Sequence, residues 1–207
     1  MRDFVKTTST HDATLDATDK LLAIYGYKKM TIDDLAREVG IGKGTVYLYF
    51  KSKEEIALTH VDRIIERLKS RLWEIAKSNR SPAGKIKQML SDRVLYRFDS
   101  VQHYSQSLNE LLAQLRPKLL ERRKRYFGEE ASILAGVLAE GSAAGDFADD
   151  AEKYAEMLVI ATNSLLPYSL STYELGGREE IEQKISDLAD LLLTGIKKRP
   201  TSRQRFQ

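Results

Sequence analysis

Cysteine is absent from the 207-residue chain, and histidine occurs only at His11, His60 and His103. The lack of cysteine excludes disulfides, thiol nucleophiles and cysteine-ligated zinc. The histidines are too scattered to indicate a metal site, and the close acid–histidine pairs with Asp12 and Asp62 have no nucleophile beside them. No glycine-rich phosphate loop follows a strand. We therefore expect no catalytic residue, no metal or other cofactor, and a protein that is not an enzyme.

Long apolar segments are also missing. The first ten residues lack the apolar stretch of a signal peptide. The most apolar stretch, residues 158–168, is interrupted by Asn163 and Pro167 and is too short to span a bilayer. Since 42% of the residues are hydrophobic and 30% are charged, the composition is that of a folded globular chain. The sequence predicts a soluble, cytoplasmic protein without membrane contact.

The charges are distributed unevenly along the chain. The formal net charge is +3, but residues 63–97 carry +7, residues 128–190 carry −11 and residues 191–207 carry +5. Such asymmetry indicates an anionic partner, for example nucleic acid. It is equally typical of charges that only solvate exposed helix faces. The charge pattern alone leaves both interpretations open.

Apolar residues recur with the period of an α-helix in nearly every segment, and no segment alternates as a strand does. Gly26 is placed to end the first helix, and Thr31 and Ser52 are placed to cap later ones. The sequence predicts an all-α fold of about nine helices, at residues 12–25, 31–39, 43–49, 52–78, 84–98, 104–113, 117–140, 150–172 and 178–198.

The stretch 78–82 is rich in Ser, Asn and Pro and is the best candidate boundary between domains. We expect a three-helix domain at residues 8–56 and a helix at 57–79 that links it to the rest. A helical domain should follow at residues 80–198, and residues 199–207 should form a disordered tail.

Three residues in the first domain have the spacing of a helix-turn-helix. Ala36 is small where the second helix crosses the first, Gly40 permits a left-handed turn, and Val46 faces inward. The second helix of such a unit can lie in a DNA major groove. This spacing also arises by chance in many helical proteins.

The flanking residues make the pattern specific. The run Thr31–Ile56, TIDDLAREVGIGKGTVYLYFKSKEEI, closely resembles the signature of the TetR (tetracycline-repressor-type) family, and the match is nearly continuous from Leu15. The rest of the chain matches that family in layout only. The resemblance implies a sequence-specific DNA-binding transcriptional regulator, most often a repressor that a small-molecule effector releases from a palindromic operator.

The resemblance also implies which residues contact DNA, and their chemistry agrees. Lysine reaches guanine acceptors or phosphates, threonine suits a base edge or a thymine methyl, and glycine permits close backbone approach. Alternatively, Tyr47 and Tyr49 are core aromatics, Lys43 and Lys53 are merely solvated, and Thr31 only caps a helix. The expected DNA contacts are Thr31, Lys43, Gly44, Thr45, Tyr47, Tyr49 and Lys53.

The helices at 151–172 and 178–198 carry apolar stripes wider than one neighbouring helix covers. We expect a homodimer through these two helices, as the resemblance implies; the alternative is that both are central in a monomer. The resemblance further implies an effector pocket, although aromatics at helical spacing are more often core. Candidate pocket residues combine aromatic faces with polar groups: Trp73, Tyr96, Phe98, His103, Tyr104, Asn109, Asn163 and Tyr168.

A second function remains open at this point. An all-helical protein–protein adaptor with a vestigial helix-turn-helix would use the wide apolar surface of residues 151–196. The substitutions Tyr47→Phe and Lys53→Ala separate the two hypotheses, because only a DNA reader should lose affinity for DNA.

Overall fold

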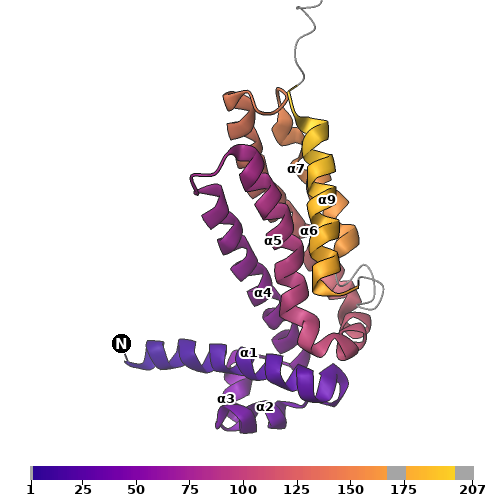
Figure 1. Ribbon diagram of the computed structural model, residues 1–207. Helices are drawn as coiled ribbons and strands as arrows, with labels where there is room; N and C mark the ends of the chain where they lie inside the picture. The colour runs from indigo at the N-terminus through magenta and orange to yellow at the C-terminus, as the bar shows by residue number, and fades with distance from the viewer. Residues whose placement is uncertain (1, 167–175, 199–207) are drawn as a thin grey trace, which may run out of the picture. The chain divides into compact units, whose positions relative to one another are not determined.

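The computed structural model describes residues 2–166 and 176–198, with side chains described from residue 10 onward except at 105–107. Within these ranges the fold is all-α, as predicted, and holds no β-strand beyond an isolated bridge between Phe147 and Lys197. The α-helices (Figure 1) are α1 (Arg2–Lys29), α2 (Ile32–Val39), α3 (Lys43–Tyr49), α4 (Lys53–Ala76), α5 (Pro82–Val101), α6 (Ser105–Ala144), α7 (Ala155–Thr162) and α9 (Arg178–Ile196). Short 3₁₀ turns are η1 (Gln102–Tyr104), η2 (Ala151–Tyr154) and η3 (Asn163–Leu165).

Gly26 breaks the first helix, as predicted. It has φ 71° and ψ 168°, a conformation that a residue with a Cβ strongly resists. Because the residues on either side are helical, α1 extends across this kink to Lys29. It also begins ten residues earlier than the predicted start at residue 12.

The prediction of separate helices at 104–113 and 117–140 is wrong. Both belong to α6, which continues through Pro117. A proline removes one backbone hydrogen bond, but its ring lies on the exposed side here, while Leu111 and Leu115 in the preceding turn are buried. Packing of the leucine face keeps the helix continuous.

The prediction of one helix over 150–172 is also wrong within the described residues. The α-helical part, α7, is bounded by η2 and η3. Leu166 is extended (φ −87°, ψ 146°), and it precedes Pro167, whose ring disfavours helical backbone in the residue before it. Residues 167–172 lie outside the described residues.

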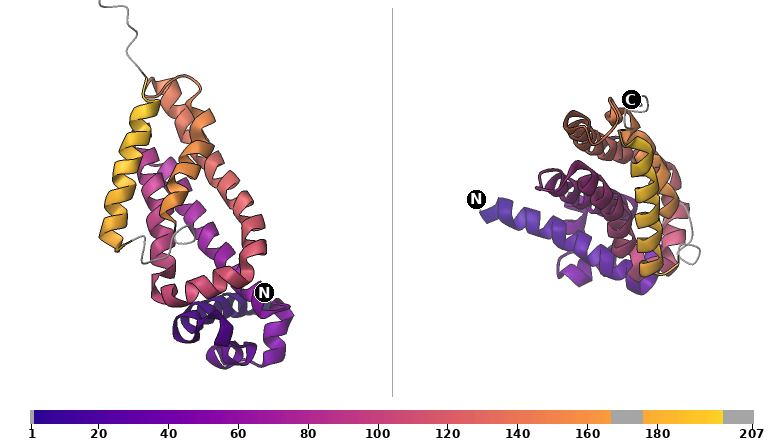
Figure 2. Two further views of the ribbon diagram at one scale, coloured as in Figure 1. Left: turned by 90° about the vertical axis from the view of Figure 1, so that its right-hand side faces the viewer. Right: turned by 45° about the horizontal axis from the view of Figure 1, so that its top comes forward.

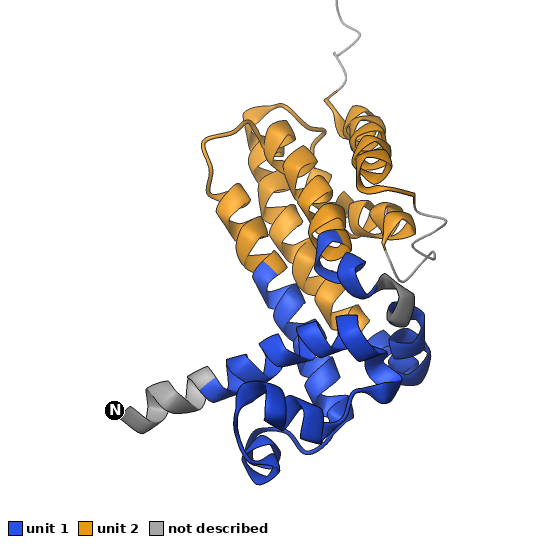
Figure 3. Ribbon diagram, turned by 60° about the horizontal axis from the view of Figure 1, so that its bottom comes forward, with its two compact units in different colours: residues 1–67, 99–122 blue, residues 68–98, 123–207 orange. Residues whose placement is uncertain are grey.

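The chain divides into two compact units (Figure 3). Residues 1–67 and 99–122 form the first, and residues 68–98 and 123–207 form the second. The core of the first joins side chains of α1–α4, such as Leu35 and Val46, to Leu108 and Leu111 of α6. Part of the predicted segment 80–198 thus packs with the N-terminal helices.

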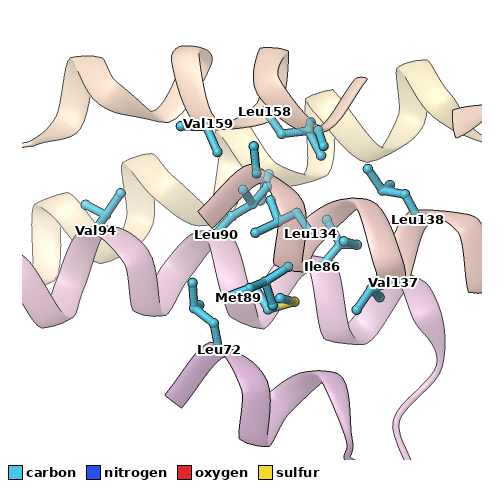
Figure 4. Close-up of a cluster of buried hydrophobic side chains, with 14 of the residues drawn as sticks. Leu72, Ile86, Met89, Leu90, Val94, Leu134, Val137, Leu138, Leu158 and Val159 are labelled. Carbon is cyan, nitrogen blue, oxygen red and sulfur yellow. The ribbon is translucent and has the colours of Figure 1, made fainter. Parts of the chain in front are cut away.

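The second unit is a helical bundle with its own core. Figure 4 shows Leu72 of α4, Leu90 of α5, Leu134 of α6 and Leu158 of α7 converging on one cluster. Helices α7 and α9 lie side by side in Figures 1 and 2, and Ile185 of α9 is fully buried in the same cluster. Among the described residues, no helix combines the length and low charge that crossing a bilayer requires.

Candidate nucleic-acid interface

The turn between α2 and α3 has the geometry that the sequence predicts. Gly40 ends α2 in the left-handed region (φ 74°, ψ 34°), and the Ile41 N–H donates to the Ala36 carbonyl at 2.9 Å. An added Cβ at Gly40 would meet nothing within 4 Å, so the glycine is required by the backbone conformation and not by crowding. With Ala36 and Val46 both buried, α3 packs tightly against α2. The two helices form a helix-turn-helix.

The start of α2 is fixed by a capping box. The Thr31 hydroxyl oxygen accepts from the Asp34 N–H at 3.1 Å, and the Thr31 N–H donates to Asp34 Oδ2 at 3.1 Å. The Thr31 hydroxyl also donates to Asp34 Oδ2 at 2.6 Å. This hydroxyl bond is the main cause of the lowered pKa of Asp34; desolvation opposes it, and the charge of Arg37 adds to it. If the Thr31 hydroxyl donated to a DNA phosphate, it would have to give up its hydrogen bond to Asp34 Oδ2.

Helix α3 presents one face outward. Lys43, Gly44, Tyr47 and Leu48 are exposed, and they share a face because Lys43 and Tyr47, and likewise Gly44 and Leu48, lie four residues apart. Val46 is fully buried on the opposite side. Three of the seven expected DNA contacts thus lie together on this outward face.

Two further expected contacts, Thr45 and Tyr49, are half-buried and lie together on another side of α3. The Tyr49 ring meets the ring of His11 edge-on, with centroids 6.4 Å apart, so this tyrosine is partly a packing residue. Sequence reasoning missed Leu48, although its spacing of four residues from Gly44 would have placed it on the outward face.

Lys43 is held by a carboxylate of the preceding helix. Its Nζ lies 2.8 Å from Asp33 Oδ2. The hydrogen bond and then the charge of Asp33 raise the pKa of Lys43. Both side chains are exposed, so a DNA phosphate or guanine would compete with Asp33 for the ammonium group.

Lys53, in the first turn of α4, donates hydrogen bonds to the C-terminal end of α1. Its Nζ donates to the carbonyls of Tyr27 at 3.0 Å and Lys28 at 3.3 Å, and it lies 4.6 Å from the centre of the Tyr27 ring. An ammonium group has three N–H donors, and a phosphate contact would use the third. Lys53 is thus a structural residue whether or not it touches DNA.

A carboxylate in the first unit lies between two of the three histidines. Asp19 of α1 is 3.3 Å from Nε2 of His60 on α4 and 2.9 Å from Nε2 of His103 in η1. His60 is buried, and the Tyr104 hydroxyl lies 3.5 Å from its Nε2. Burial alone would raise the pKa of Asp19, but the hydrogen bonds and charges of His60 and His103 together lower it.

The candidate pocket residues divide between the two units. His103, Tyr104 and Asn109 belong to the first, whereas Trp73, Tyr96, Phe98 and Asn163 belong to the second. Trp73 is 52% exposed and Phe98 is buried in the core. The Arg71 guanidinium lies 5.3 Å from the centre of the Tyr96 ring. Tyr168 lies outside the described residues.

Asn163 belongs to a buried polar network that the sequence did not predict. Its Oδ1 accepts from Arg93 Nη2 at 2.6 Å, and Arg93 Nε donates to Glu130 Oε2 at 2.6 Å. Arg97 also bonds to Glu130, and Arg93 also bonds to Thr162. The network joins α5, α6, α7 and η3 within the second unit. No local motif marks it, because the side chains that bond between helices are 33 to 70 residues apart.

Comparison with known proteins agrees with the helix-turn-helix geometry. Residues 15–59 match the family described as "Bacterial regulatory proteins, tetR family". Over 189 residues the chain is 25% identical to the Fatty acid metabolism regulator protein of Bacillus subtilis (strain 168), covering 88% of this chain and 93% of that protein. It is also 25% identical over 191 residues to the HTH-type transcriptional repressor KstR2 of Mycolicibacterium smegmatis (strain ATCC 700084 / mc(2)155), covering 91% of each.

Solved structures share the fold over nearly the whole chain. A transcriptional regulator from Cytophaga hutchinsonii ATCC 33406 superposes with a TM-score of 0.74 at 21% identity, covering 90% of this chain and 97% of that one. The regulator FadR from Bacillus subtilis, in complex with stearoyl-CoA, gives a TM-score of 0.66 at 20% identity, covering 89% and 98%. The helix-turn-helix domain therefore belongs to the TetR family of bacterial regulatory proteins, and the chain as a whole shares the fold of solved transcriptional regulators.

Proposed function

We propose that the chain is a homodimeric, cytoplasmic repressor that binds a palindromic operator and is released from it by a small-molecule effector. The observation that carries this proposal is the outward face of α3, where Lys43, Gly44 and Tyr47 lie opposite the buried Val46. A helix of this kind fits a major groove and supplies donors for base edges and phosphates. The action is binding and not catalysis.

A dimer is supported by apolar side chains on α7 and α9. Met157, Ile160 and Leu191 are 60%, 57% and 71% exposed, although both helices also contribute to the core. Exposed apolar side chains on neighbouring helices are typical of a surface that a partner covers. A second copy of the chain would bring two copies of α3 to half-sites about 34 Å apart.

Fatty acyl-CoA esters are the effector class that we propose. This choice comes from the relative named for fatty acid metabolism and from the FadR structure with stearoyl-CoA. An effector can shift the protein between DNA-binding and released states only as far as it binds one state better than the other. Stearoyl-CoA should therefore lower operator affinity, whereas free CoA and stearate should act weakly.

The first test is selection of random duplex DNA by the purified protein at moderate salt, followed by sequencing of the bound pool. Enrichment of a palindrome with half-sites one helical turn apart supports the proposal. Salt-labile binding without an enriched sequence would overturn it and favour the adaptor hypothesis. On the recovered operator, Tyr47→Phe should lose affinity, and stearoyl-CoA can then be titrated into the complex.

A further inference from the structure

Leu48 is the most exposed large hydrophobic side chain among the described residues, at 82%. It lies in α3, directly after Tyr47, on the outward face. The core side of the helix is provided by Val46, which is fully buried. Leu48 therefore contributes little to the packing of α3. The fold of the protein does not by itself require a leucine at this position.

The turn that precedes Leu48 is bare. A helical side chain leans toward the N-terminus and covers the residue four positions earlier, which is Gly44 in this helix. A Cβ added at Gly44 would meet nothing within 4 Å. The leucine side chain thus stands beside exposed backbone, where another surface can approach closely and touch its methyl groups.

The chemistry of this face selects among the groups of a major groove. Lys43 and Tyr47 carry N–H and O–H donors, which match base acceptors and phosphates. An isobutyl group matches none of the polar groups on the base edges. The one apolar group in the major groove is the C5-methyl of thymine.

We propose that Leu48 determines operator specificity by contacting the C5-methyl group of a thymine in each half-site. This inference rests on the proposed function, because it requires α3 to enter the major groove. Burying one methyl against Leu48 should tighten binding about fourfold, which corresponds to about 0.8 kcal/mol. Two half-sites of a dimer together should give roughly fifteenfold.

The test removes the methyl group and the leucine separately. In the operator recovered from random DNA, thymines are replaced by deoxyuridine at one symmetric pair of positions at a time, which deletes only the methyl groups. Dissociation constants are measured by fluorescence anisotropy for the wild type, Leu48→Ala and the control Leu120→Ala. Leu120 is a 47% exposed leucine on α6 of the same unit.

The wild type and Leu120→Ala should lose roughly fifteenfold in affinity at one pair of positions. Leu48→Ala should bind the thymine and uracil operators equally. Equal sensitivity of Leu48→Ala and the wild type, or a wild type indifferent to every thymine methyl, overturns this inference alone. A wild type that enriches no operator overturns the proposed function as well. Because Leu48 is exposed, its alanine variant should keep the wild-type unfolding midpoint, which separates loss of contact from loss of fold.

Discussion

Gly44 lies inside the short helix α3, where alanine would favour the helix by up to about 1 kcal/mol. Because an added Cβ would meet nothing within 4 Å, Gly44→Ala should leave thermal stability unchanged or raise it. It should nevertheless weaken operator binding roughly tenfold, since a methyl group would hold the backbone away from base contacts worth ~1–3 kcal/mol each. Thermal unfolding and DNA titration of the same samples measure both effects.

Gly136→Ala is the matched control for this substitution. Gly136 is an exposed glycine inside α6, and a Cβ added there also meets nothing within 4 Å. The control should show the same trend in stability with no change in DNA affinity. If Gly44→Ala binds the operator as tightly as the wild type, the backbone of α3 does not approach DNA closely.

Asp33 pairs with Lys43, and we expect it to compete with DNA for this lysine and to repel phosphate. Asp33→Asn should therefore tighten operator binding by roughly threefold near 0.1 M salt. The control Glu38→Gln removes the same charge from α2, but Glu38 pairs with Lys20 of α1 at 2.6 Å. If Glu38→Gln tightens operator binding less than Asp33→Asn does, the difference between the two variants measures the effect of freeing Lys43 from Asp33. Weaker binding by Asp33→Asn would instead mean that the ion pair positions Lys43 for its contact.

At the scale of elements, Asp19 joins α1 to α4 and η1 through His60 and His103. The pKa of Asp19 in the folded chain is lowered from its ordinary value of 3.8. Its stabilising contribution is therefore present above that pH and is lost as the pH falls through the lower folded value. Asp19→Asn should reduce the unfolding midpoint by roughly 2 °C at pH 5, because a partly exposed ion pair contributes little.

The difference between Asp19→Asn and the wild type should shrink as the pH falls below 3.8, as followed by thermal unfolding from pH 2.5 to 6. Asp12→Asn, at an exposed carboxylate on the same helix, is the control. A difference that stays constant over this range would show that the charge of Asp19 does not stabilise the fold.

Elements whose signals are local could be predicted from the sequence. The capping box of Thr31 and Asp34 and the turn at Gly40 each depend on residues within five positions of one another. Pro117 was misread because tertiary packing of neighbouring leucines outweighs its local effect on α6. The Arg93–Glu130 contact could not be predicted, since nothing near either residue in sequence indicates the other.

The resemblance implied DNA contacts at Lys43 and Tyr47, and both side chains are exposed on the outward face of α3. Leu48, the thymine contact that we propose, was not among the residues expected to touch DNA. The roles of Lys53 and Asp33 in the free protein required three-dimensional structure, since their partners lie 25, 26 and 10 residues away.

At the scale of the whole molecule, the charge blocks of the sequence pair with each other. Lys69, Lys85 and Lys87, from the basic block 63–97, lie 2.6, 2.8 and 2.7 Å from carboxylates of the acidic block 128–190. The second unit therefore neutralises much of this basic segment internally. This pairing is a third interpretation of the asymmetry, beside a nucleic-acid partner and charges that only solvate exposed helix faces.

The proposed assembly of two copies is the property on which the proposed operator recognition depends most. Leu191→Glu places a charge on the exposed apolar side of α9. Burying an unpaired charge in an interface costs several kcal/mol, so the dimer dissociation constant should rise at least roughly a hundredfold. Sedimentation velocity across a concentration series measures this shift, with Leu120→Glu as the control.

The Leu191→Glu variant also tests whether binding to the full palindrome requires the dimer. A monomer contacts only one half-site, so Leu191→Glu should lose affinity for the full palindrome but bind an isolated half-site as the wild-type monomer does. A Leu191→Glu protein that remains dimeric would place the interface elsewhere on the chain. A monomeric variant that binds the palindrome as tightly as the wild type would mean that each half-site is read independently. In that case, joining the two copies adds nothing measurable to the affinity for DNA.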